Sequence, residues 1–166
     1  MHIDKRKVRN VNKFGTKRAF TLIEVLVVIG IIAILAAVVL VAVNPARQFK
    51  LARDSQRVSN VNAILNAVGQ NMAEHKGLFV CEGNSRDLPP APALMRDSGY
   101  QSDDSDVAHC LVPDYLSSMP FDPSIVGAHY ASTTDYNTGY DIFRDTAGRV
   151  TVSSVGELTP IISVTR

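Results

Sequence analysis

The sequence predicts an α+β fold, in which one long N-terminal helix packs against a small antiparallel β-sheet. Three observations lead to this prediction. Residues 25–43 form an uninterrupted apolar run of 19 residues. Residues 46–75 repeat apolar side chains at the three- and four-residue spacing of an amphipathic helix. Beyond residue 77, short apolar segments alternate with turn residues, which is typical of a small sheet.

The basic N-terminus and the apolar run together predict a membrane anchor over residues 20–44. Residues 1–19 carry seven basic side chains and one acid, a charge of +6, whereas the rest of the 166-residue chain carries −5. Nineteen helical residues extend roughly 28 Å, enough to cross a hydrocarbon core of about 30 Å. The positive-inside rule then leaves the N-terminus in the cytoplasm and the C-terminal part outside the cytoplasmic (inner) membrane, as a single-pass protein.

Two other classes of apolar segment are alternatives to a membrane anchor. A buried core helix is seldom apolar on every side over such a length. The apolar region of a secretory signal peptide is shorter and is followed by small residues at a cleavage site. This run continues instead into Val43-Asn44-Pro45 and a further helical pattern, although Ala36-Ala37 keep the signal peptide open as an alternative.

Glu24 is the unusual residue of the membrane segment, because it separates Phe20-Thr21-Leu22-Ile23 from the apolar run. A carboxylate within a membrane segment costs about 2.5–3.5 kcal/mol and is a functional-site hypothesis by default, whereas one at the membrane edge is simply hydrated. The basic leader, the stretch Phe20-Thr21-Leu22-Ile23-Glu24 and the apolar run together resemble the signal of type IV prepilins and of the major pseudopilins of type II secretion.

The resemblance implies a processing site and a set of partners. A prepilin peptidase would cut between Ala19 and Phe20, release residues 1–19 as the leader and methylate Phe20 at its new amino group. Most members of the family have glycine before the cut, where this chain has Ala19, and Gly15 is a competing site. Glu24 would become the fifth mature residue and set the register of assembly. The implied partners are further copies of the chain, the peptidase/methyltransferase, an inner-membrane assembly platform and the lipid bilayer.

The second helical segment, residues 45–76, is expected to be amphipathic. Pro45 predicts a kink or a local loss of helix at its start, and Gly77 is well placed to end it. Its apolar stripe consists of Val58, Val61, Leu65, Val68 and Met72, widened by Ile64 and Ala67. We interpret its four basic side chains as a solvated face near lipid headgroups or neighbouring subunits, with no specific nucleic-acid partner: Arg47, Lys50, Arg53 and Arg57.

Residues 77–166 are expected to form the globular part. Strands are predicted at residues 128–131, 140–144 and 149–155, with a further strand at 161–165. The turn Asp145-Thr146-Ala147-Gly148 predicts a hairpin between the second and third of these. Ahead of them, Tyr115-Leu116 and Pro120-Phe121-Asp122-Pro123 resemble the stretch that precedes the short antiparallel sheet of major pseudopilins.

Cys81 and Cys110 are the two cysteines of the chain, and translocation would place them where disulfides form. Closing a loop of about 30 residues stabilises a fold by roughly 3.6 kcal/mol in the chain-entropy model. Free thiols, a metal site with His109 and His129, and a Cys–His nucleophile remain as alternatives.

Two groups of oxygen ligands are candidates for calcium. One is Asp103-Asp104-Ser105-Asp106. The other consists of Asp135, Asn137 and Asp141, and its position resembles the loop in which some major pseudopilins hold calcium. We prefer the second group, although neither has EF-hand spacing. No other cofactor is expected.

The sequence favours a structural role over catalysis. It contains no glycine-rich phosphate loop, zinc-ligand helix or nucleophile elbow. Resemblance to the pilin family implies a subunit that polymerises through its apolar helix into a type IV pilus-like filament. A pseudopilus of a type II secretion system is the alternative within the family, and a membrane-anchored binding protein that never assembles is the alternative outside it.

Overall fold

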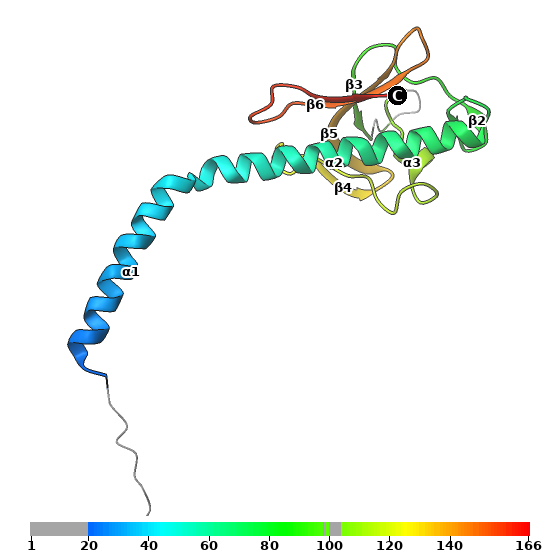
Figure 1. Ribbon diagram of the computed structural model, residues 1–166. Helices are drawn as coiled ribbons and strands as arrows, with labels where there is room; N and C mark the ends of the chain where they lie inside the picture. Colours follow the sequence, from blue (N-terminus) through cyan, green and yellow to red (C-terminus); the bar gives the residue numbers. More distant parts are fainter. Residues whose placement is uncertain (1–19, 98, 100–103) are drawn as a thin grey trace, which may run out of the picture. The chain divides into compact units, whose positions relative to one another are not determined.

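The described chain begins with two helices that a single residue separates (Figure 1). The computed structural model describes residues 20–97, 99 and 104–166, so residues 1–19 lie outside it. Helix α1 spans Leu22–Val43 and α2 spans Pro45–Glu74. Asn44 between them is left-handed, with φ 45° and ψ 78°, a conformation that asparagine tolerates at a helix end. The chain divides at this point into two compact units, Met1–Asn44 and Pro45–Arg166.

Helix α1 is apolar and exposed along its whole length. None of its 22 residues is buried, and Glu24 is its one charged residue. Among the described residues it is the one helix long and apolar enough to cross a membrane. This is consistent with membrane anchoring, since a helix apolar on every side needs a lipid or protein environment to cover it.

Helix α2 is amphipathic and packs against strands β6 (Val150–Ser154) and β7 (Ile162–Thr165). Its buried apolar residues are Val61, Ile64, Leu65, Ala67 and Val68, each at most 2% exposed. The helix ends as predicted at glycine: Gly77 has φ 89°, and its N–H donates to the Met72 carbonyl at 2.8 Å.

Two predictions for the first half of α2 are wrong. Val58, placed in the buried stripe, is 45% exposed, and Arg57, placed on the solvated face, is 1% exposed. The physical reason is that the guanidinium of Arg57 pairs with two carboxylates, Asp122 on a loop of the globular unit and Asp54 on α2 itself. The buried face of this half of the helix is therefore polar.

The main sheet of the second unit is antiparallel and has five strands. Strands β3 (Ala93–Arg96), β5 (Asp135–Arg144), β6 and β7 lie in that order, and β4 (His129–Ser132) also pairs with β5. The predicted hairpin at Asp145–Gly148 joins β5 to β6, where Val150 pairs with Arg144. Together with the long N-terminal helices, this sheet confirms the α+β class.

The elements that the sequence did not predict are short. They are β1 (Val80–Cys81), β2 (Asn84–Ser85), β3 and the single-turn helix α3 (Ala108–Leu111). Strand β5 also begins five residues earlier than predicted. The sequence pattern did not indicate its first half, because that half contains Asn137 and Gly139, which are poor strand formers. Gly139 has φ 72°, and a Cβ there would lie 3.0 Å from the Cβ of Asp122. This position therefore requires glycine.

Candidate functional site

The N-terminal end of α1 is held by a capping box, which is formed by Thr21 and Glu24. The Thr21 hydroxyl accepts a hydrogen bond from the Glu24 N–H at 3.2 Å. In return, Oε2 of Glu24 accepts from the Thr21 N–H at 3.3 Å. Threonine followed three residues later by glutamate is the sequence pattern of this cap. Glu24 thus has a local structural role that the sequence analysis did not consider.

The cap fixes where Glu24 lies. A carboxylate in the first turn also interacts favourably with the positive end of the helix dipole. Phe20 lies just before the cap and is 81% exposed. Its predicted partner in the cleavage site, Ala19, lies outside the described residues. The described part of this region is therefore an exposed aromatic residue, a capped helix start and one acid, followed by an apolar surface.

A family model for the prokaryotic N-terminal methylation motif matches residues 15–40. The match covers the proposed cleavage site, Glu24 and most of the apolar run. The chain carries a prepilin-type signal. This signal supports membership of the type IV pilin and pseudopilin class, whose motif marks structural proteins. The comparisons with curated proteins and with solved structures gave no match.

A second cluster, which the sequence analysis missed, joins α2 to two loops of the globular unit. The guanidinium of Arg57 donates to both carboxylate oxygens of Asp122, at 2.6 and 3.0 Å, and to Oδ1 of Asp54 at 2.7 Å. It also donates to the Ser124 hydroxyl at 2.6 Å. Arg57 and Asp122 are both at most 2% exposed. The charge of this buried arginine is therefore paired, and most of its N–H groups donate hydrogen bonds.

Asp54 extends this Arg57 cluster to the loop between β6 and β7. Its two oxygens accept from the backbone N–H groups of Glu157, Leu158 and Thr159, at 2.8, 2.9 and 3.1 Å. Glu157 in turn pairs with Arg53 through two hydrogen bonds. The first half of α2 therefore holds the 121–125 loop through Arg57 and the 157–159 loop through Asp54.

These contacts lower the pKa values of the carboxyl groups in the cluster. The backbone N–H of Glu157, followed by those of Leu158 and Thr159 and by Arg57, holds the pKa of Asp54 far below its usual range. Burial opposes the shift at Asp122, but hydrogen bonds from Arg57 and the Ser124 and Ile125 N–H groups still lower its pKa. The hydrogen bond from Arg53 lowers the pKa of Glu157. All three groups are thus held as carboxylates.

One feature of the sequence could have indicated this cluster. Arg57 lies four residues before Val61 and seven before Ile64, so it continues the buried stripe by one helical turn. Asp54 lies a further three residues earlier, within reach of Arg57 along the same helix. The partners themselves are distant in sequence: Asp122 lies 65 residues after Arg57, and the 157–159 loop lies about 100 residues after Asp54. Helical periodicity does not contain that information.

Cys81 and Cys110 are joined by a disulfide with an S–S distance of 2.08 Å. It links β1 to the single-turn helix α3. Together with the His109 ring, their sulfur atoms form a group within 4.8 Å that could otherwise hold a metal ion. Thiolate is the form of cysteine that binds metals. The disulfide therefore leaves His109 as a single ligand, and His129 lies elsewhere, 2.9 Å from Asp135.

The structure does not bring the preferred calcium ligands together. Asp135, Asn137 and Asp141 lie along strand β5 rather than in a loop. Six residues of extended strand separate Asp135 from Asp141, roughly 20 Å, whereas one cation binds oxygens at about 2.3–2.6 Å. Asp135 is paired with His129, and its hydrogen bond to the ring raises the pKa of that histidine. Within the other acidic group, Asp103 lies outside the described residues.

Proposed function

We propose that this protein is the structural subunit of a type IV pilus-like filament. It is made as a prepilin, cleaved between Ala19 and Phe20, methylated at Phe20 and polymerised through its N-terminal helix. The observation that carries the proposal is the exposed apolar surface of α1, most of which lies within the matched prepilin-type signal. Such a surface suits two environments in succession, the bilayer before assembly and the core of a filament afterwards.

Glu24 supplies the register of assembly in this proposal. Cleavage before Phe20 creates an amine four residues from the carboxylate. If neighbouring subunits are staggered, the amine of one and the carboxylate of the next compensate each other in an apolar surrounding. Removing the carboxylate leaves a desolvated, unpaired charge, which costs more than the pair contributes. The capping hydrogen bonds with Thr21 support this role, since they hold the Glu24 side chain near the start of the helix.

Before assembly, the protein is a single-pass protein of the inner membrane, with a cytoplasmic N-terminus and an extracytoplasmic globular unit. Its partners are the prepilin peptidase/methyltransferase, the assembly platform, the bilayer and further copies of itself. The Cys81–Cys110 disulfide supports the extracytoplasmic placement, because disulfides persist in oxidising compartments.

A pseudopilus of a type II secretion system is the second candidate. The stretch Pro120-Phe121-Asp122-Pro123 favours it by resemblance, and Asp122 is the residue of that stretch that binds Arg57. The disulfide-closed loop and Asn44-Pro45-Ala46-Arg47 favour a pilus, and on balance we prefer the pilus. Electron microscopy of sheared surface material from strains with and without the protein distinguishes them, because a pilus extends beyond the cell surface.

Processing tests the proposal against a membrane-anchored binding protein that never assembles. Intact-mass analysis of the membrane-extracted protein is expected to show a chain that begins at a methylated Phe20. An Ala19→Gly variant is expected to be cut at least as completely, whereas Ala19→Leu is expected to retain the leader. A wild-type protein that keeps residues 1–19 would instead support the non-assembling anchor.

A further inference from the structure

Two loops of the globular unit lie side by side at the first half of α2. Loop 121–128 precedes β4, and loop 155–161 joins β6 to β7. The guanidinium of Arg57 contacts both loops, since it donates to the Ser124 hydroxyl at 2.6 Å and lies 3.6 Å from Oε1 of Glu157. The Ser124 hydroxyl lies 3.4 Å from the same Glu157 oxygen. We call loops 121–128 and 155–161 the loop pair.

Exposed apolar side chains occupy the tips of both loops. Val126 is 99% exposed, and Val155 and Ile161 are each 70% exposed. Ile161 also shares a groove with Leu51 and Val58 of α2, so the apolar surface of its loop continues onto the helix. Exposed apolar surface of this kind is typical of a site that binds a protein or a membrane.

The carboxylates of the loop pair do not reach its exposed surface. Each loop contains one acid. Asp122 is buried and bound to Arg57, and Glu157 is paired with Arg53. The two arginines therefore neutralise the loop pair from the side of the helix, and the exposed residues of both loops are uncharged.

The exposed charge on the first half of α2 is basic. Arg47 and Lys50 are exposed, Phe49 between them is 63% exposed, and the one acid of this half, Asp54, is buried. Next to loop 121–128, the exposed Asp135 is paired with His129. The second half of α2 and its surroundings instead expose charges of both signs: Glu74, Lys76, Glu82, Asp114, Arg149 and Arg166. Basic side chains beside an aromatic one suit the headgroup region of an anionic bilayer.

A bilayer is close to this surface along the chain. One residue, Asn44, separates α2 from α1, the helix that is long and apolar enough to cross a membrane. Asp54, which binds N–H groups of loop 155–161, lies nine residues after Pro45, roughly 14 Å along a helix. A surface tethered at this distance meets the bilayer at a high effective concentration. The lipid surface is therefore the partner that both the charge and the tether favour.

We propose that the loop pair docks on the surface of the bilayer in which the same chain is anchored. Val126, Val155 and Ile161 enter the headgroup layer, and Arg47 and Lys50 bind the phosphates of anionic lipids. Hydrogen bonds from α2 fix both loops before they meet the lipid, which lowers the entropic cost of docking. The inference rests on the membrane stage of the proposed function and adds a docked state of the globular unit before assembly.

The chain has no tryptophan, so a tryptophan introduced at a loop tip reports only its own surroundings. Val126→Trp and Val155→Trp place an indole on each loop. The full-length variants are reconstituted in phosphatidylcholine vesicles with about 30% phosphatidylglycerol, with and without bromine on the acyl chains. Flotation confirms that the chain is in the vesicles. Bromine is expected to quench the fluorescence of each variant by about half or more, because the indole lies in the headgroup layer.

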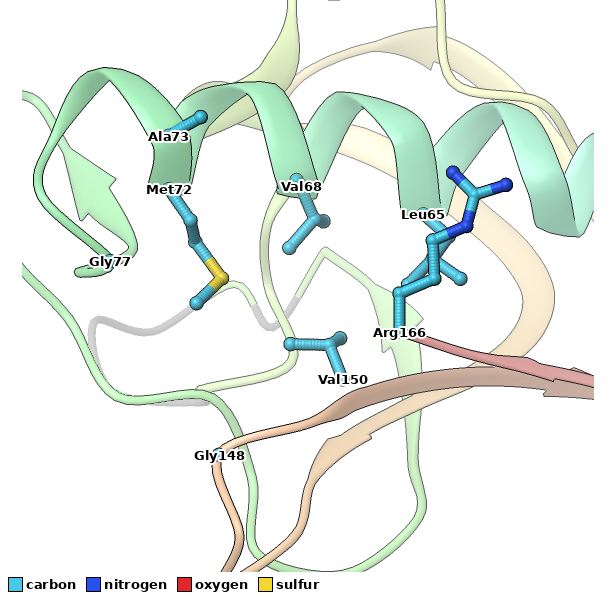
Figure 2. Close-up of a pocket in the computed structure, with 9 residues that line it drawn as sticks. Leu65, Val68, Met72, Ala73, Gly77, Gly148, Val150 and Arg166 are labelled. Carbon is cyan, nitrogen blue, oxygen red and sulfur yellow. The ribbon is translucent and has the colours of Figure 1, made fainter.

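Ala147→Trp is the matched control. Ala147 is exposed on the turn between β5 and β6. Its neighbour Gly148 lines an apolar hollow of about 320 Å³ together with Val68 and Met72, so this turn lies at the second half of α2 (Figure 2). Its indole is expected to lie outside the headgroup layer and to lose about a tenth of its fluorescence or less.

A pair of charge variants tests the basic residues. Arg47→Gln/Lys50→Gln, made in the Val126→Trp chain, is expected to lower the quenching by about twofold and to remove its dependence on phosphatidylglycerol. Lys76→Gln/Arg149→Gln changes the net charge equally at the other half of α2. It is expected to leave the quenching unchanged.

The outcomes separate the docking from the anchor. If Val126→Trp and Val155→Trp float with the vesicles but are quenched no more than Ala147→Trp, the docking is overturned and the anchor stands. Unquenched emission that shifts to shorter wavelength as protein is added to a fixed amount of lipid would assign the loop pair to a second copy of the chain, which also overturns the docking. A wild-type chain that does not float with the vesicles would overturn the anchor and the docking together.

Discussion

Arg57 shows how a single residue determines the arrangement of the globular unit. Its guanidinium is buried against two carboxylates, Asp54 and Asp122, which bind two loops far apart in sequence. Burying an arginine costs several kcal/mol unless the charge is paired and hydrogen-bonded, and here both conditions are met. The residue that the sequence analysis placed on the solvated face is the one that closes the globular unit around α2.

Removing Arg57 is therefore expected to be strongly destabilising. Arg57→Ala leaves two buried carboxylates without their cation, which typically costs about 3–5 kcal/mol. Arg149→Ala is the matched control, because Arg149 pairs with Asp145 at the surface, where a salt bridge contributes about 0–1 kcal/mol. Denaturant unfolding of the two purified variants measures the difference. Equal stabilities would show that the Arg57 cluster does not hold the loops.

The carboxylates of the cluster predict a pH dependence with a definite sign. Their pKa values are lower in the folded protein than in the unfolded chain. The unfolded chain therefore binds more protons in acid, and the free energy of unfolding rises with pH in that range. The contribution of these three groups to stability is expected to be constant above about pH 5 and to fall progressively below about pH 4.

Denaturant midpoints measured from about pH 7 to about pH 3 check this expectation. Glu157→Gln removes one of the shifted groups and should flatten the acid limb of the curve. A midpoint that rises on acidification would contradict the assignment of these groups as carboxylates that the fold stabilises.

At the scale of elements, the sequence predicts what depends on local pattern and misses what depends on distant contacts. The 19-residue apolar run, the Val61–Leu65–Val68 stripe and the Gly77 stop all follow from periodicity and backbone preference, and the structure has them. Strand β3 has no alternating pattern and forms because it pairs with β5. The first half of β5 likewise depends on pairing with β3 and β4, which overrides the weak strand preference of Asn137 and Gly139.

In the candidate site too, the features that are local in sequence were predictable, and those that depend on distant contacts were not. The signal around Phe20 and Glu24 was predictable because it is local in sequence. The Arg57 cluster was not, since its partners come from two distant loops. Asp135, Asn137 and Asp141 do not form the predicted calcium site for a geometric reason. Alternate residues of one strand share a face, but Asp135 and Asp141 lie too far apart along β5 to share a cation.

The disulfide links two short elements, β1 and α3, and its removal is expected to lower the free energy of unfolding. Its two cysteines are 29 residues apart in sequence. In the chain-entropy model, closing a loop of this size contributes roughly 3.6 kcal/mol through the unfolded state. The double variant Cys81→Ser/Cys110→Ser is expected to lose about 3–4 kcal/mol.

Denaturant unfolding under oxidising and reducing conditions tests the disulfide prediction. The reductant should destabilise the wild type and leave the double variant unchanged. A double variant as stable as wild type would show that the loop is held by its other contacts.

On the scale of the whole molecule, the two units differ in the chemical character of their surfaces. The described part of the first unit is an apolar helix without a buried residue, and the second unit has its own core and an acidic balance. The net charge of +1 combines a leader of +6 with a remainder of −5. Removing the leader therefore leaves an acidic protein whose apolar content belongs partly to a surface for membrane insertion and assembly.

In the proposed filament, α1 is an assembly helix whose register depends on Glu24. The most direct measurement is the yield of sheared filaments, seen by electron microscopy and quantified by immunoblot, for Glu24→Ala beside wild type. We predict that the variant inserts in the membrane and loses its leader normally. Its filament yield is expected to fall by about tenfold or more, because the amine of a neighbouring Phe20 loses its partner. An unchanged filament yield for Glu24→Ala would contradict the claim.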